Sequence, residues 1–237
     1  MDSDPASNDG LPLRQHAIIV GASGSGKSNT VMSLIVRKIR DKQHLHIIDA
    51  KYELGPIFGK QKNVWITKPD YAEAKFDELI AMAEMRQNMF AQASELCGCL
   101  VRDYGEYFKV TGLKMPIITL VVEELIVTMG AVKEDKLVKL LVTGRSAGIF
   151  VVACSQYLKA DILSRKGSVN FSTRVFMGRW DSTTASILFG SLTKAQTEEY
   201  QNYTGAPGKA IVEINGELST KQMPRISEGQ LQQYMKP

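Results

Sequence analysis

Short apolar runs alternate with helical patterns along most of the chain. The apolar runs predict strands at 16–20, 45–49, 63–67, 117–122, 149–154 and 173–177. Each run is rich in Ile, Val or Phe, as expected where helices cover both faces of a parallel sheet. The spacing of apolar residues between the runs predicts helices at about 27–40, 71–95, 132–143, 181–189 and 193–201. The alternation therefore predicts an α/β fold with a mostly parallel sheet flanked by helices.

The last part of the chain has a different pattern. Residues 209–214 and 217–223 flank the pair Asn215-Gly216, which is typical of a β-hairpin on a two-residue turn. We expect this C-terminal hairpin to extend one edge of the sheet. Since no linker, internal repeat or low-complexity run divides the chain, residues 14–237 are expected to form a single domain. Residues 1–13 are expected to be a flexible N-terminal tail.

Composition narrows the class of protein. The chain has 237 residues, of which 44% are hydrophobic, enough for a substantial core in one domain. No apolar run approaches the roughly 20 residues that span a bilayer, so we expect no transmembrane segment. The formal net charge of +4 is too small to argue for nucleic-acid binding by itself. Cys97, Cys99 and Cys154 show no disulfide or zinc spacing and are expected to be reduced, as in a cytosolic protein.

A glycine-rich segment, residues 21–28, lies between the first predicted strand and the first predicted helix and reads Gly-Ala-Ser-Gly-Ser-Gly-Lys-Ser. In this setting loop N–H groups and the helix N-terminus face phosphate oxygens, so the segment predicts an ATP phosphate site. Lys27 can reach the β- and γ-phosphates and the Ser28 hydroxyl can bind Mg²⁺. The alternative is a glycine-rich turn that binds nothing. The residues assigned to nucleotide binding are Gly21, Ala22, Ser23, Gly24, Ser25, Gly26, Lys27, Ser28 and Asn29.

A second segment, residues 117–124, is a predicted buried strand that ends in two acids, Glu123 and Glu124. The carboxyl ends of parallel strands are where α/β folds hold ligands. A P-loop enzyme needs one acid in the Mg²⁺ shell and another group that orients the attacking water. We assign the metal side to Glu123, through water, and the catalytic side to the pair. The alternative is a strand that merely ends in solvated acids.

A third segment, residues 142–156, places polar groups at both ends of one predicted strand. Gln156 follows the strand at the ligand edge, where an amide can sense the γ-phosphate or position water. Arg145 precedes the strand, at the opposite edge from its own P-loop. We therefore expect Arg145 to act on ATP across a subunit boundary, as an arginine supplied in trans. The alternative is a helix C-terminal arginine that complements the helix dipole.

Together these segments resemble the FtsK–HerA group of ring-forming, DNA-pumping ATPases. The resemblance is spread over nearly the whole chain after residue 14. It is carried by GASGSGKS at 21–28, IIDAKYEL at 47–54, EMRQNMF at 84–90, the strand ending in two acids, GRSAGIFVVACSQ at 144–156, SVNFSTRVFMGRWDSTTASILFG at 168–190 and GAPGKAIVEING at 205–216. The implied fold is a P-loop NTPase of the RecA/FtsK-like kind.

The resemblance also implies residue roles. Glu124 looks like the water-polarising acid, Gln156 like the sensor, and Arg145 like the arginine finger. Asp49 and Lys51 resemble the family's Asp-x-Lys pair after the second strand. The family usually has Asp where this chain has Glu123. The extra methylene of Glu moves the carboxylate on the metal side by about a bond length.

Basic residues after the sensor strand form a further candidate group. Lys159, Arg165 and Lys166 are candidates for contact with DNA phosphates, and Arg174 or Arg179 for contact with a nucleotide at a subunit boundary. The alternative for each is an ordinary solvated surface. Residues 101–114 interleave basic and aromatic side chains, which suits a loop that grips a DNA backbone or, equally, a packed tyrosine cluster. The side chains concerned are Arg102, Tyr104, Tyr107, Lys109 and Lys114.

The resemblance implies an ATP- and Mg²⁺-dependent ring, a pentamer or hexamer, that moves double-stranded DNA without sequence preference. Because the chain shows no membrane segment, long linker or added β-barrel, we expect it to be most like the genome-packaging ATPases of DNA viruses. Such a motor would load a preformed capsid from the host cytoplasm, with portal or vertex proteins as partners, and could be virion-associated. The alternatives are a plasmid, conjugative or chromosomal DNA translocase, a small-molecule P-loop kinase, and a nucleotide-switched assembly protein.

Overall fold

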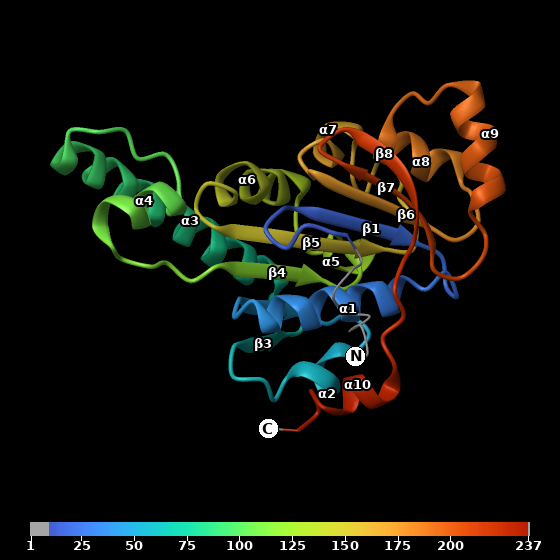
Figure 1. Cartoon of the computed structure of the whole chain (residues 1–237), viewed down its shortest axis with the longest axis horizontal. Helices are drawn as coiled ribbons and strands as arrows, with labels where there is room; N and C mark the ends of the chain where they lie inside the picture. Colours follow the sequence, from blue (N-terminus) through green and yellow to red (C-terminus); the bar gives the residue numbers. More distant parts are fainter. Residues whose placement is uncertain (1–9, 237) are drawn as a thin grey trace, which may run out of the picture.

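The structure is a computed structural model that describes residues 10–236. One sheet runs through it (Figure 1). Its strands are β1 Ala17–Gly21, β2 His44–Ile48, β3 Val64–Thr67, β4 Ile118–Val122, β5 Ile149–Ser155, β6 Thr173–Met177, β7 Lys209–Ile214 and β8 Glu217–Gln222. The order across the sheet is β3-β2-β4-β5-β1-β6-β7-β8. The first six are parallel, and β7 and β8 pair antiparallel, so the predicted sheet and hairpin are confirmed.

The strands β1, β4, β5 and β6 are buried on both faces, and their successive side chains point to opposite sides of the sheet. In β1, Ala17 and Ile19 face one side, and Ile18 and Val20 face the other. The first side is covered by α1 (Lys27–Arg40) and α2 (Leu54–Phe58). The second side is covered by α3 Ala72–Cys97, α5 Leu125–Thr128, α6 Glu134–Gly144, α8 Ser182–Phe189 and α9 Lys194–Tyr203.

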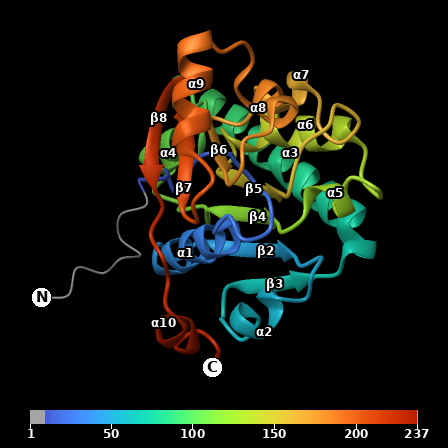
Figure 2. The same cartoon turned by 90° about the vertical axis from the view of Figure 1, so that its right-hand side faces the viewer.

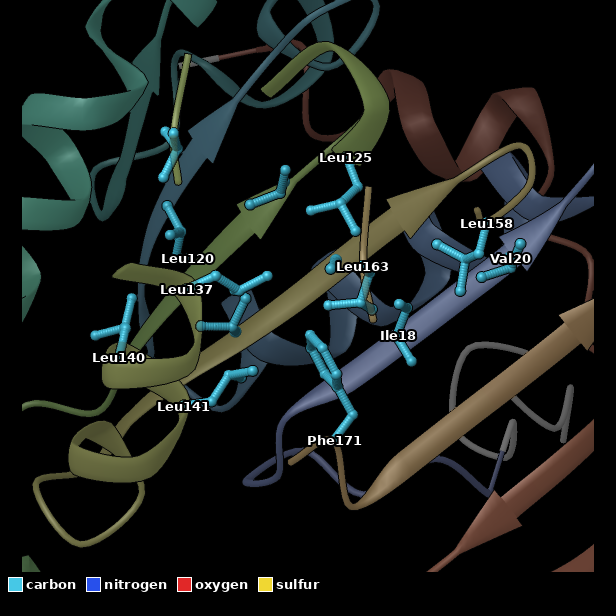
Figure 3. Close-up of a cluster of buried hydrophobic side chains, with 14 of the residues drawn as sticks. Ile18, Val20, Leu120, Leu125, Leu137, Leu140, Leu141, Leu158, Leu163 and Phe171 are labelled. Carbon is cyan, nitrogen blue, oxygen red and sulfur yellow. The ribbon is translucent and has the colours of Figure 1, made fainter. Parts of the chain in front are cut away.

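The larger core cluster lies on the second side (Figure 3). Leucines of α6 and the segment between β5 and β6 converge there on strands β1, β4 and β5. Phe171 and Leu163 from that segment are fully buried. Burying each such side chain contributes about 1.5–3 kcal/mol. The carboxyl ends of β1, β4 and β5 are thereby fixed relative to one another.

The predicted helices are present with their ends shifted by at most two residues, as with α3 at Ala72–Cys97 instead of 71–95. Most of the helices that the sequence missed have only four or five residues, too few to display a 3.6-residue repeat. The missed helices are α2, α4 (Tyr104–Thr111), α5, α7 (Arg165–Ser168), α10 (Glu228–Gln232) and a 3-10 turn at Pro69–Tyr71. Within residues 10–236 no helix has the length and apolar character that crossing a bilayer requires.

Helices α3 and α4 project together beyond the sheet (Figure 1). The predicted backbone-gripping loop at 101–114 is wrong in its central part, because residues 104–111 are helical. Asp103 caps this helix by accepting hydrogen bonds from two backbone N–H groups of its first turn. Tyr107 is buried, with its ring 5.6 Å from that of Phe90, as the packed-tyrosine alternative expects.

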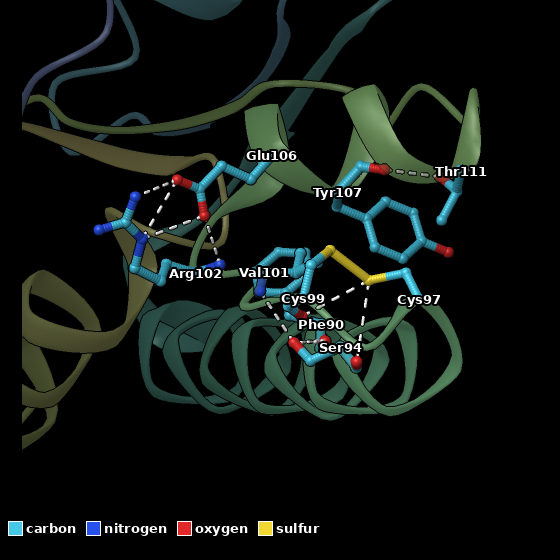
Figure 4. Close-up of a disulfide and its surroundings, with 9 residues drawn as sticks. All are labelled: Phe90, Ser94, Cys97, Cys99, Val101, Arg102, Glu106, Tyr107 and Thr111. Carbon is cyan, nitrogen blue, oxygen red and sulfur yellow. Dashed lines mark hydrogen bonds and ion pairs between the residues drawn. A yellow bond between two sulfur atoms is a disulfide. The ribbon is translucent and has the colours of Figure 1, made fainter.

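The expectation that Cys97 and Cys99 are reduced is contradicted by a disulfide between them (Figure 4). Helix α3 ends at Cys97, and Gly98 follows in the left-handed region with φ 64°. This reversal leaves the two Cα atoms 5.3 Å apart, within the range that a disulfide spans. Sequence spacing alone does not reveal such a local turn. Cys154 has a free thiol and is buried in β5.

The predicted tail, residues 1–13, lies partly outside the description, which leaves out residues 1–9. Leu11 is buried and Leu13 packs against the same core cluster as α1. The carbonyl of Leu13 accepts a hydrogen bond from the buried ammonium of Lys38. The packed part of the chain therefore begins before the predicted domain boundary at residue 14.

The segment after β8 crosses α1 and carries α10 to the side of α2 (Figure 2). The phenol oxygen of Tyr234 accepts a hydrogen bond from Arg40 (3.1 Å), and its backbone carbonyl accepts one from Gln61 (2.8 Å). The Tyr234 ring also lies 6.1 Å from that of Phe58. The C-terminal segment is thus fastened over the helix that follows the phosphate loop.

Arg174 lies inside the subunit, which corrects its predicted contact with a nucleotide at a subunit boundary. Arg174 of β6 and Glu213 of β7 are register partners and form a buried ion pair. The guanidinium also donates to the carbonyl of Leu188 (2.8 Å). The sequence showed a basic residue in a strand but did not show that its side chain points into the core.

Replacing Glu213 by Ala is expected to lower the free energy of unfolding by about 3 kcal/mol, since it leaves the Arg174 guanidinium buried without its carboxylate. Urea denaturation followed by circular dichroism measures this. Glu217→Ala, at an exposed position of β8, is the matched control and should change the value by less than about 0.5 kcal/mol. Equally small changes in both variants would contradict a buried pair.

Candidate nucleotide-binding site

The predicted phosphate loop connects β1 to α1 in a compact turn. Gly24 (φ 80°) and Gly26 (φ 91°) adopt left-handed conformations that side chains disfavour. A Cβ on Gly21 would lie 2.6 Å from the Ser25 hydroxyl and 2.9 Å from the carbonyl of Met177. Helix α1 has no side-chain cap and no acid in its first turn. Its N-terminal N–H groups and dipole therefore favour an anion at the loop.

A cavity of about 550 Å³ opens over this loop. Lys27 and Ser28 line it together with Lys51 and Gln156, which follow two other strands. The full lining comprises Ala22, Ser23, Gly24, Gly26, Lys27, Ser28, Asn29, Met32, Lys51, Glu53 and Gln156. The sequence assigned most of these residues. Met32 and Glu53 were missed, and no motif pointed to them.

The two acids at the end of β4 share one ammonium group. The Lys51 ammonium lies 3.0 Å from one carboxylate oxygen of Glu123 and 3.1 Å from one of Glu124. The other oxygen of Glu123 accepts a hydrogen bond from the backbone N–H of Lys51 (3.0 Å). Glu123 and Glu124 are only 6% and 4% exposed, so they are not the solvated strand end of the alternative interpretation.

These contacts oppose the effect of burial on protonation. Burial raises the pKa of Glu123 above its ordinary value, and the Lys51 ammonium limits that rise. Burial would lower the pKa of Lys51, but its bonds to both carboxylates outweigh burial and raise it to about 12. Lys51 therefore stays charged, and it favours the charged form of Glu123.

Asp49 stabilises the turn that carries Lys51, a role that the Asp-x-Lys motif did not reveal. Its two carboxylate oxygens accept hydrogen bonds from the N–H groups of Glu53 (3.1 Å) and Gly55 (2.7 Å). These bonds close the turn that leads into α2. Asp49 and Glu123 directly follow the paired residues Ile48 and Val122. The ammonium and the acids consequently meet at the same edge of the sheet.

Gln156 is placed by β5, which lies between β1 and β4. Its backbone N–H donates to a carboxylate oxygen of Glu124 (3.2 Å), and its side chain lines the cavity. Gln156, Glu124 and the phosphate loop therefore lie close together, as the sequence predicted.

The residues near the loop fit a magnesium ion. Ser28 and Glu123 both line a small cavity of about 10 Å³, the volume that one water molecule needs. A hydroxyl and a single carboxylate, completed by phosphate and water oxygens, form a donor set typical of Mg²⁺. The described residues contain no cluster of three or more His, Cys, Asp or Glu that could hold a metal alone. Cys154 also borders this cavity, and burial raises the pKa of its thiol to about 12.

Arg145 lies away from this cavity, at the opposite edge of the sheet. It follows α6 and precedes β5, whose other end carries Gln156. Arg145 lines a separate cavity of about 520 Å³ whose other basic members are Arg14 and Arg102. Arg14 pairs with Asp41, and Arg102 pairs with Glu106. The predicted placement of Arg145 away from its own P-loop therefore agrees with the structure.

The remaining basic residues that the sequence singled out do not form one cluster around the nucleotide cavity. Arg165 donates hydrogen bonds to the carbonyls of Ile187 and Leu188, so its guanidinium caps the C-terminal end of α8. Lys159 lies over the Tyr157 ring, 5.5 Å from its centre, and Lys166 is exposed. Arg179 is exposed just after β6 and does not line the nucleotide cavity.

The first half of the chain identifies its family. Residues 12–139 match the family described as the central domain of the helicase HerA. The chain belongs to this family. This membership confirms the predicted FtsK–HerA group, and with it the P-loop ATPase fold.

Curated relatives are DNA translocases. The chain is 28% identical over 187 residues to the DNA translocase FtsK of Chlorobaculum tepidum and 26% identical over 239 residues to the DNA translocase SftA of Bacillus subtilis. The matches cover 70% and 91% of this chain but 22% and 24% of the relatives. The chain thus spans less than a quarter of the length of these relatives.

Solved structures share the fold. The pCW3 conjugation coupling protein TcpA, solved with ATPγS, has a TM-score of 0.75 and 20% identity, covering 94% of this chain and 64% of that chain. The genome packaging NTPase B204 of Sulfolobus turreted icosahedral virus 2, also with ATPγS, has a TM-score of 0.56 and 16% identity, covering 92% of this chain and all of that chain. These likenesses support the fold assignment.

Replacing Lys51 by Ala is expected to move the acid limb of the pH–turnover profile to higher pH by about one unit. Without the ammonium, the pKa of Glu123 rises further. The Glu123 carboxylate is therefore protonated, and its negative charge lost, at a higher pH than in the wild type. ATP turnover measured across the acidic and neutral range tests this. Lys60→Ala, in the exposed turn after α2, is the control. An unshifted acid limb in Lys51→Ala would contradict the assigned role.

Proposed function

We propose that this chain is an ATP-hydrolysing motor domain that moves double-stranded DNA. The observation that carries the proposal is the meeting of the phosphate loop, the Lys51-bridged acid pair and Gln156 at one cavity. Membership of the HerA family and the similarity to DNA translocases support the DNA substrate. A small-molecule kinase needs neither a DNA partner nor an arginine from a second subunit.

The roles of the residues follow from their positions. Loop N–H groups and Lys27 bind the β- and γ-phosphates. Ser28 and Glu123 would hold Mg²⁺, which neutralises charge on the transferring phosphoryl group. Glu124 orients the attacking water, and the side chain of Gln156 contacts the water or the γ-phosphate. The buried setting of the two acids strengthens each of these electrostatic contacts.

Arg145 is proposed to act on the ATP of a neighbouring subunit. The seven residues of β5 separate it from the cavity edge. At about 3.3 Å per residue this strand spans roughly 20 Å, much further than one arginine side chain extends. A head-to-tail ring, pentameric or hexameric, brings one edge of a subunit to the opposite edge of the next. Arg179, exposed beside the phosphate loop, is proposed to lie at the same boundary.

Within DNA translocation, the finer assignment proposed is packaging of a viral genome into a preformed capsid. The match that extends over the whole solved chain of the packaging NTPase B204 supports it. In that setting the motor works in the host cytoplasm or on the virion, against portal or vertex proteins. Transfer of a conjugative plasmid is the second candidate, which the higher TM-score to the coupling protein TcpA favours.

Linear duplex DNA is expected to stimulate ATP turnover by the assembled protein. Glu124→Gln should bind ATP but lose turnover by about two orders of magnitude or more, since the amide cannot polarise water. Phosphate release with and without DNA, alongside the mass of the assembly, measures this. Glu134→Gln, in the first turn of α6, is the control. Turnover that ignores DNA would favour a kinase, and unchanged function in Glu124→Gln would favour a nucleotide-switched assembly protein.

Mixing two inactive variants tests the shared site. Arg145→Ala should bind ATP yet lose turnover, whereas Lys27→Ala should lose nucleotide binding. In a mixed ring, a subunit with an intact phosphate loop can lie beside a subunit with an intact Arg145. Partial recovery of turnover on mixing is therefore the expected result. A mixture as inactive as its parts, with mixed rings verified by mass, would contradict action in trans.

A further inference from the structure

A buried arginine of α3 holds the turn that precedes β5. Arg86 is only 4% exposed, and its guanidinium donates hydrogen bonds to the backbone carbonyls of Ala147 (2.6 Å) and Pro116 (3.0 Å). Ala147 lies in the turn between α6 and β5, which begins at Arg145, and Pro116 shortly precedes β4. Arg86 therefore joins the beginnings of two strands that carry Gln156 and the two acids at their other ends.

The burial of this guanidinium is costly. An arginine stays charged in proteins, and taking its charge out of water without a counter-charge is unfavourable. Among the residues that the structure describes, no carboxylate pairs with Arg86, and burial lowers the pKa of its guanidinium below the ordinary value. An apolar side chain of similar volume would avoid this cost. What the guanidinium provides, and an apolar side chain cannot, is the pair of hydrogen bonds to the carbonyls of Ala147 and Pro116.

Two further hydrogen bonds hold the same turn. The side-chain amide of Gln87, also in α3, donates to the carbonyl of Thr143 in the last turn of α6 (3.2 Å). The backbone N–H of Tyr104 in α4 donates to the carbonyl of Ser146 (2.9 Å). Gly148 ends the turn with φ 71°, and a Cβ there would lie 3.1 Å from the Tyr104 ring. Helices α3 and α4 therefore fix the backbone around the turn on the side that faces them.

The backbone of this turn decides where the Arg145 side chain can reach. Arg145 is exposed, and within residues 10–236 its guanidinium makes no hydrogen bond or ion pair. Since no such contact fixes the side chain, a shift of the turn moves the guanidinium with it. A misplacement of about 1 Å can lower the rate of a reaction about a hundredfold.

We propose that Arg86 is a positioning residue for Arg145. By holding the carbonyl of Ala147, Arg86 sets the place from which the Arg145 guanidinium reaches the ATP of a neighbouring subunit. This inference rests on the proposed function and adds the residue that aims the arginine supplied in trans. No residue of α3 lines the nucleotide cavity of its own subunit, so this helix serves the neighbouring site.

Arg86→Met tests the inference on the assembled protein, because Met fills part of the same volume and donates no hydrogen bond. Turnover at saturating ATP should fall by about tenfold or more, and KM for ATP should stay within about twofold, because the subunit's own nucleotide cavity is untouched. Arg86→Lys, whose ammonium can still donate, should recover part of the turnover. Lys139→Met removes a cation from an exposed pair between α6 and α3. It is the matched control and should change turnover by less than about twofold.

Mixed rings separate this positioning role from a merely structural one. Arg86→Met mixed with Lys27→Ala should regain part of the turnover, since the Lys27→Ala subunit supplies a correctly held Arg145. Arg86→Met mixed with Arg145→Ala should regain none, because both variants lack the same function. Adding Arg86→Met to an Arg145→Ala chain should lower turnover no further, as expected of two changes in one unit.

Each outcome decides a different question. Unchanged turnover in a folded Arg86→Met protein, or recovery on mixing it with Arg145→Ala, would overturn the inference and leave the proposed function intact. A KM raised in proportion to the loss of turnover would also overturn it, because Arg86 would then serve the nucleotide site of its own subunit. Full turnover by Arg145→Ala would contradict the arginine in trans and the inference together. If the melting temperature shows that Arg86→Met does not fold, Arg86→Gln, which also removes the charge, takes its place under the same criteria.

Discussion

The ammonium of Lys51 between two adjacent buried carboxylates is the interaction on which the candidate nucleotide-binding site depends. Burial of the Glu123 carboxylate without a counter-charge would raise its pKa and favour its protonated form. Lys51 offsets this effect through contacts of 3.0 and 3.1 Å. Lys51 extends from the turn before α2, which Asp49 stabilises by accepting hydrogen bonds from the N–H groups of Glu53 and Gly55. Asp49, which follows β2, thus stabilises the turn that carries the Lys51 ammonium, and this ammonium favours the charged form of Glu123, which follows β4.

The strand order places the two acids and the phosphate loop at one site. Strand β5 separates β1 from β4, so the phosphate loop and the acids are not direct neighbours. Gln156, which follows β5, lies between the loop and the acids, and its backbone N–H donates a hydrogen bond to Glu124. The same strand places Arg145 at the far edge. Strand β5 therefore leads from Arg145 at one edge of the sheet to Gln156 at the nucleotide cavity on the other.

The sequence was sufficient for the features that depend on local order. The loop at 21–28, the paired acids and the Asn215-Gly216 hairpin were predicted because each is a short pattern with a defined backbone conformation. Features set by tertiary packing were not predicted. Arg174 was indistinguishable from a surface arginine until β7 placed Glu213 opposite it. The Cys97–Cys99 disulfide depends on the reversal at Gly98, and the role of Asp49 depends on where α2 begins.

The charge at the cavity argues that the site within one subunit is incomplete. Two ammonium groups, those of Lys27 and Lys51, face three carboxylates, those of Glu53, Glu123 and Glu124. With these groups ionised, the described side chains at the cavity carry a net charge of −1, whereas a triphosphate is itself strongly anionic. Loop N–H groups and the helix dipole supply only about half a positive charge. In the proposed ring, a metal ion and Arg145 of a neighbouring subunit would supply further positive charge.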